Sequence, residues 1–147
     1  MADRRTPEEI SRNMSLVRGK DTKPEVLVRK YLFSKGLRFR KNDPRLPGKP
    51  DVVLPKYRTV VFVNGCFWHA HEGCRRASVP ESHREYWEAK LRRNKERDAE
   101  VEKELKEAGW KVLTVWECGL KKSVMNATLD SLIEAIRSDS PKRTEFP

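Results

Sequence analysis

Residues 50–74 constrain the fold most strongly, because two strand-forming runs lead there directly into a cluster of cysteines and histidines. The runs PDVVLP (50–55) and RTVVFVNG (58–65) are rich in β-branched residues, and the Pro-Lys-Tyr stretch between them predicts a β-hairpin. The second run ends in GCFWHAHEGC (65–74), which contains two of the chain's three cysteines and two of its three histidines. At this point four interpretations of the segment are open: a strand end with incidental cysteines, a metal site, an active site, or several of these at once.

Hydrophobic periodicity places further elements around this hairpin. Helices are expected at residues 22–36, 81–108 and 123–137, and strands at 37–42 and 111–118. This order predicts an α/β fold, a mixed sheet with helices packed on its faces. The 147 residues fit one domain, and we divide the chain into a polar N-terminal arm (1–20), a folded domain (21–138) and a disordered tail (139–147).

Charge and cysteine content indicate the partner and the compartment. Lys and Arg number 32 against 22 Asp and Glu, a net charge of +10. Such a surplus favours an anionic partner, nucleic acid before others, over an idle basic surface. The N-terminus lacks the apolar segment of a signal peptide, no run is long enough to span a bilayer, and an odd number of cysteines argues against a secreted disulfide framework. We therefore expect a cytoplasmic protein without membrane attachment.

The spacing of Cys and His fits three ligands of a tetrahedral zinc site, namely Cys66, Cys74 and either His69 or His71. Cys118 supplies a fourth if its strand lies beside the second strand of the hairpin. Three ordinary free or buried cysteines are the alternative. Spacing leaves open which of the two histidines is not a zinc ligand, and whether that histidine is only solvated or serves as a general base.

Three acidic residues and one asparagine have both structural and catalytic interpretations. Asp51, at a strand start, could bind a divalent cation or only stabilise a turn. Glu25, three residues after Thr22, is either a capping-box residue or a catalytic one. Asn94 and Asp98 lie on one helical stripe with apolar residues, which predicts polar partners on an active-site face unless the stripe end is exposed. The stripe comprises Trp87, Leu91, Asn94, Asp98, Val101, Leu105 and Ala108.

Together with GWKVLTVWEC (109–118), these motifs resemble the very short patch repair endonucleases, the Vsr family of bacterial DNA mismatch endonucleases. The likeness extends from about Arg12 to about Leu120 and implies a fold akin to type II restriction enzymes. It also implies Mg²⁺-dependent nicking of the T-bearing strand, 5′ to T·G mismatches that arise when 5-methylcytosine deaminates. The implied partners are mismatched double-stranded DNA and, as further candidates, mismatch-repair proteins, with the protein acting as a monomer on bacterial DNA.

The resemblance also implies roles for individual residues. Structural zinc would be held by Cys66, His71, Cys74 and Cys118, and catalysis would involve Glu25, Asp51, His69, Asn94 and Asp98. Mg²⁺ would be bound by Asp51 and the backbone carbonyl of Val63. The aromatic wedge that enters the base stack would comprise Phe67, Trp68 and Trp87, with Met14 of the arm inserting from the minor groove.

The chain departs from the restriction-enzyme pattern at two positions, since neither the expected acid near Val61 nor the expected lysine near Val63 is present. His69 would take the place of that lysine as the base. Asn64 stands where a relative carries histidine, so we assign it no catalytic role. Two alternatives are a non-catalytic zinc-containing DNA-binding protein and a restriction endonuclease that cuts both strands. In a DNA-binding protein Phe67 and Trp68 would still stack on bases, unless they only pack in the core.

Overall fold

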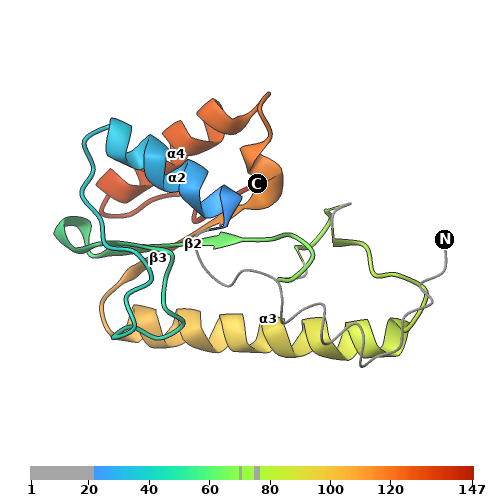
Figure 1. Ribbon diagram of the computed structural model, residues 1–147. Coiled ribbons are helices and arrows are strands. Elements are labelled where there is room, and N and C mark those ends of the chain that lie inside the picture. The colour runs from blue at the N-terminus through green and yellow to red at the C-terminus, as the bar shows by residue number, and fades with distance from the viewer. Residues whose placement is uncertain (1–21, 70, 75–76) are drawn as a thin grey trace.

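The computed structural model describes residues 22–69, 71–74 and 77–147, which form a mixed four-stranded sheet between helices (Figure 1). The strand order is β1-β2-β3-β4, with β1 antiparallel to β2 and the other two pairings parallel. The strands are β1 (Val52–Leu54), β2 (Thr59–Asn64), β3 (Lys111–Trp116) and β4 (Glu145–Phe146). The expected α/β class and the hairpin are therefore confirmed, while the arm and Met14 lie outside the described residues.

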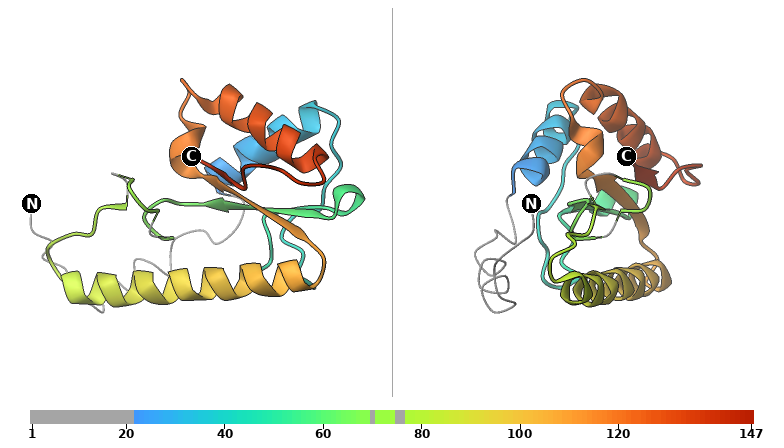
Figure 2. Two further views of the ribbon diagram at one scale, coloured as in Figure 1. Left: turned by 180° about the vertical axis from the view of Figure 1, so that it is seen from behind. Right: turned by 90° about the vertical axis from the view of Figure 1, so that its right-hand side faces the viewer.

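In the part of the chain that the structure describes, three α-helices cover the sheet, with α2 and α4 on one face and α3 along the other (Figure 2). Their bounds are α2 (Lys23–Ser34), α3 (Arg84–Glu107) and α4 (Met125–Arg137), and short 3-10 turns are η1 (Pro55–Tyr57) and η3 (Glu117–Leu120). Thr22 caps α2 as expected, because its side chain accepts a hydrogen bond from the backbone N–H of Glu25. Within the described residues, no helix combines the length and apolar character needed to cross a membrane.

The hydrophobic core consists of two layers separated by the sheet. The layer under α2 and α4 includes Leu32, Leu113, Leu132 and Phe146, and the smaller layer over α3 includes Val60, Leu105 and Val112. Each fully buried Leu or Val contributes about 1.5–3 kcal/mol relative to an exposed one. The sheet is thus held from both sides, which fixes the strand ends that carry the candidate site.

The strand predicted at residues 37–42 is wrong. In the structure this segment makes one isolated β-bridge, between Arg40 and Val53, with both backbone hydrogen bonds at 2.8 Å. The alternation in the sequence reflects only that Leu37 and Phe39 contact the core. Extended pairing stops because Asn42 adopts a positive φ of 48°, a left-handed conformation that turns the chain away.

The C-terminal segment also differs from the expected disordered tail. Glu145 and Phe146 form β4 beside β3, and the Phe146 side chain is only 1% exposed within the core. Composition alone does not predict this pairing, because Phe146 is the one large hydrophobic residue in the segment. Its order derives from the open edge of β3 and from the burial of Phe146.

Candidate active site

Parallel pairing of β2 with β3 brings two distant segments together. Asn64 is in register with Trp116, so both strands end at the same edge of the sheet. The chain continues from β2 into residues 65–74, which we call the Cys-His segment, and from β3 into η3. The backbone N–H of Cys118 donates to Cys66 Sγ at 3.4 Å. The expectation that Cys118 reaches the cluster through a neighbouring strand is therefore confirmed.

Four side chains at this edge converge on one point. The Sγ atoms of Cys66, Cys74 and Cys118 and one ring nitrogen of His71 all lie within 4.8 Å of one another. Burial lowers the pKa of His71, which favours the neutral ligand form of its ring, and burial raises the pKa of Cys66 to about 12. Three cysteines, which bind metal ions as thiolates after losing their protons, and a neutral imidazole form a suitable ligand set, and the histidine among them is His71 rather than His69.

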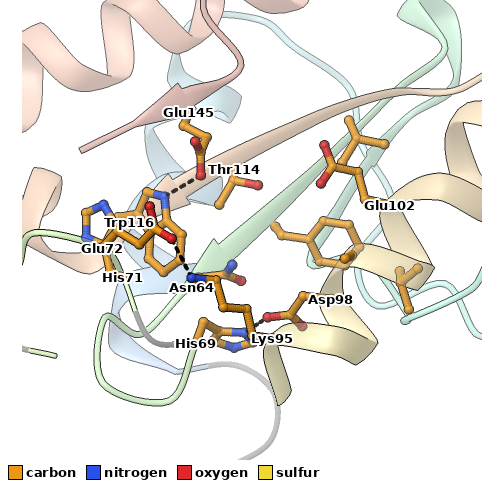
Figure 3. A pocket seen from close by; sticks show the side chains of 14 residues that line it. Asn64, His69, His71, Glu72, Lys95, Asp98, Glu102, Thr114, Trp116 and Glu145 are labelled. Carbon is orange, nitrogen blue, oxygen red and sulfur yellow. Dashed lines mark hydrogen bonds and ion pairs between the residues drawn. The ribbon is translucent and has the colours of Figure 1, made fainter. Parts of the chain in front are cut away.

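His69 instead faces α3. Its Nδ1 lies 2.5 Å from Asp98 Oδ2, and the two side chains are 29% and 36% exposed (Figure 3). One turn earlier on α3, the side-chain amide of Asn94 donates to the backbone carbonyl of Trp68 at 2.9 Å. The polar residues of the stripe therefore both have partners from the Cys-His segment, as expected. Of the apolar stripe residues, Trp87, Leu91 and Leu105 are buried and Val101 is partly buried. Ala108 is exposed because it follows the last residue of the helix.

A cleft of about 510 Å³ opens between α3 and the ends of β2 and β3 (Figure 3). We call it the α3 cleft. The polar side chains that line it include Asn64, His69, Lys95, Asp98, Glu102 and Thr114. The imidazole of His69 is thus both hydrogen-bonded and accessible from a cavity large enough for a small ligand group.

Asp51 belongs to a second group of polar residues, centred on α2. Its Oδ2 accepts a 2.6 Å hydrogen bond from the backbone N–H of Val63. Burial raises the pKa of Asp51 to about 7, the Val63 N–H opposes this shift, and the charge and hydrogen bond of Glu25 add to it. Two acidic side chains therefore share a largely buried site, an arrangement that a divalent cation would stabilise.

Arg29 holds this acidic group together. Arg29 is only 7% exposed. Its Nη2 donates to Glu25 Oε2 at 3.1 Å, to Asn42 Oδ1 at 3.2 Å and to the Asp51 backbone carbonyl at 3.1 Å. Arg29 was not predicted as a site residue from the sequence, although its position four residues after Glu25 on one helix was a usable signal. Glu25 is thus more than a cap, because its carboxylate contacts Arg29 and Asp51.

The predicted wedge residues form one aromatic cluster. The ring centroid of Phe67 lies 5.0 Å from that of Trp68 and 5.2 Å from that of Trp87, and both pairs have edge-to-face geometry. Phe67 and Trp68 are half-buried, whereas Trp87 is only 4% exposed and lies in the core. Two of the three rings therefore present surface to solvent, and the third supports them.

The fold and the converging side chains define the class: an α/β protein with a Cys/His cluster able to hold a metal ion, next to a histidine-aspartate pair in a cleft. Comparison with known proteins narrows this class. Residues 2–76 match the family described as DNA mismatch endonuclease Vsr, and the chain belongs to this family.

Two relatives show how far the likeness extends. The type II nicking enzyme V.NmeAIP of Neisseria meningitidis serogroup A is 48% identical, covering 93% of this chain and 98% of the relative. The DNA mismatch endonuclease Vsr of Escherichia coli K12 is 43% identical, covering 82% of this chain and 77% of the relative.

Proposed function

We propose that this protein is a Mg²⁺-dependent DNA endonuclease that nicks the T-bearing strand 5′ to T·G mismatches produced by 5-methylcytosine deamination. Family membership, relatives named as nicking and mismatch endonucleases, and a net charge of +10 support it. The observation that carries the proposal is the hydrogen bond between His69 and Asp98 at the α3 cleft. A non-catalytic DNA-binding protein would have no need for an accessible imidazole oriented by a carboxylate.

His69 is the proposed general base. Asp98 accepts a hydrogen bond from His69 Nδ1, which places the ring proton on that nitrogen and leaves Nε2 with its lone pair. Nε2 can then take a proton from the water that attacks the phosphodiester. Asn94 holds the Trp68 carbonyl immediately before His69 and so fixes the backbone that carries the imidazole.

The acidic group around Asp51 is the proposed Mg²⁺ site. Asp51 and the backbone carbonyl of Val63 would bind the ion, and Glu25 would assist through its contact with Asp51. Bound Mg²⁺ would polarise the scissile phosphate and stabilise its developing charge. Arg29 keeps the two carboxylates adjacent by offsetting part of their negative charge.

The Cys/His cluster is the proposed structural zinc site. Zinc bonds of about 2.3 Å to sulfur and about 2.1 Å to nitrogen in a tetrahedron imply a sulfur-nitrogen distance of roughly 3.6 Å. Cys118 Sγ and His71 Nδ1 are 3.6 Å apart, which fits. Because His69 lies between the ligands Cys66 and His71, a bound zinc would restrain the backbone of the base.

The two half-buried aromatic rings are the proposed mismatch wedge. Phe67 and Trp68 would enter the base stack, where a wobble pair is easier to unstack than a matched pair. Trp87 would hold these two rings in position, because it is buried and its ring packs against both of them. Met14 of the N-terminal arm would insert from the minor-groove side.

We further propose a restriction-endonuclease-like fold, a monomeric protein located in the bacterial cytoplasm on DNA, and mismatch-repair proteins as additional partners. The mixed sheet flanked by helices is compatible with that fold. The proposed domain division assigns DNA contact to residues 1–20 and catalysis to residues 21–138.

The proposal is tested with an end-labelled duplex carrying one T·G pair and the matched T·A duplex, both in Mg²⁺. The parent protein should nick only the T-bearing strand of the mismatched duplex. His69→Ala and Asp51→Ala should bind that duplex and leave it intact. Binding without nicking by the parent supports the DNA-binding module instead, and cleavage of both strands of the matched duplex supports a restriction endonuclease.

A further inference from the structure

The last three residues, which we call the C-terminal clamp (145–147), pack against the end of β3. Glu145 and Phe146 pair with Thr114 and Val115, immediately before the strand end that leads to Cys118. Phe146 is buried in the core, which holds this segment against the sheet. In Figure 2 the C-terminus lies close to the turn that follows β3.

Glu145 connects the clamp to one of the converging metal donors through Trp116. The indole N–H of Trp116 donates to Glu145 Oε1 at 3.2 Å. The same indole stacks on the His71 imidazole, with ring centroids 4.0 Å apart and ring planes inclined by 6° (Figure 3). The lone pair of an imidazole nitrogen lies in the ring plane. A fixed indole therefore restrains the plane in which the lone pair of His71 Nδ1 lies, and Cys118 Sγ lies 3.6 Å from this nitrogen.

Pro147 makes a second connection, beside Cys118. A Cβ atom added to Gly119 would lie only 1.1 Å from the Pro147 backbone oxygen. The end of the chain therefore lies directly against the backbone of η3, where only glycine leaves room. The clamp thus contacts the segment of one donor and, through an indole, the ring of another.

We infer that the C-terminal clamp positions the metal ligands, with Glu145 and Trp116 as positioning residues that are not ligands themselves. The inference depends on the proposed zinc site. Groups that orient metal ligands from outside the coordination shell typically contribute 10- to 100-fold to metal affinity. The residues of the clamp are distant in sequence from Cys66, His71 and Cys74.

The test compares four variants whose zinc ligands are unchanged. Glu145→Ala removes the acceptor for the indole N–H, Glu145→Gln keeps an acceptor oxygen, and a chain ending at Thr144 lacks the whole clamp. Glu134→Ala, an exposed glutamate on α4, is the matched control. Zinc affinity is measured by competition with a chromogenic chelator, and ligand geometry by the visible absorption of Co²⁺ loaded in place of zinc.

We expect Glu145→Ala and the shortened chain to lose about tenfold or more in zinc affinity and to show an altered Co²⁺ spectrum. Glu145→Gln and Glu134→Ala should match the parent, a rescue that general destabilisation would not produce. If Glu145→Ala keeps the affinity and spectrum of a zinc-containing parent, the inference is overturned, whether or not the shortened chain folds. A parent that binds no zinc would instead overturn the proposed zinc site and, with it, the inference.

Discussion

Replacing Asp98 by Asn should slow nicking without weakening DNA binding. The carboxylate lies 2.5 Å from His69 Nδ1, where it would stabilise the imidazolium that forms if His69 takes a proton as the proposed base. Unit charges about 4 Å apart interact by roughly 4 kcal/mol at an effective dielectric constant of about 20 and by roughly 1 kcal/mol in water. The pair is 36% and 29% exposed, which places it between these limits. A loss of about 1.5–3 kcal/mol corresponds to roughly 10- to 150-fold in rate.

The assay is single-turnover nicking of a labelled T·G duplex, with binding measured separately. Glu102→Gln is the matched control, since Glu102 lines the same cleft one turn further along α3 but pairs with Lys106 at 3.0 Å. His69→Ala should cost about 10²-fold or more, and adding Asp98→Asn to it should cost nothing further, because the carboxylate acts only through the imidazole. A parent-like rate for Asp98→Asn, or additive losses in the double variant, would refute the pairing of these residues in catalysis.

Three further predictions follow from the other groups. Cys118→Ser should lower both zinc content and melting temperature, measured by metal analysis and thermal unfolding, and an unchanged melting temperature would count against a structural metal. Burial raises the pKa of Asp51 from 3.8 to about 7, so the free energy of unfolding should fall as pH rises from about 4 to about 7. In denaturant titrations without Mg²⁺, Asp51→Asn should reduce that fall. An identical pH dependence in the parent and the variant would contradict the raised pKa. Trp68→Ala should weaken binding to the T·G duplex more than to the matched one, and equal losses on both would argue against the wedge.

Local patterns in the sequence predicted the elements that depend on short-range physics. Thr22 and Gly36 delimit the first helix because a cap and a left-handed glycine are local devices. The β-branched runs predicted β2 and β3, and their adjacency was enough to bring Cys118 to Cys66. Spacing alone could not choose between the two histidines. In the structure the two histidines differ, because His71 lies with the three cysteine side chains whereas His69 contacts Asp98 on α3.

The features that were missed depend on tertiary contacts. Phe146 is held in place because its strand pairs with the edge of β3 and its side chain packs in the core. Composition reveals neither of these contacts. Arg29 acquires its importance from Asp51 and Asn42, which lie beyond its own helix. Residues 37–42 alternate like a strand, yet the short β1 offers them only the partner Val53. Periodicity reports which side of a segment is buried, whereas pairing requires a partner of matching length.

The most direct measurement maps the cleavage position on each strand of a duplex with one T·G pair, with and without Mg²⁺. A DNA mismatch endonuclease with the proposed site should yield one nick, on the T-bearing strand 5′ to the mismatch, only when Mg²⁺ is present. Asp51→Ala should give no product at any Mg²⁺ concentration that supports the parent. Cleavage without a divalent cation, nicking of the G-bearing strand, or full activity of Asp51→Ala would contradict the account.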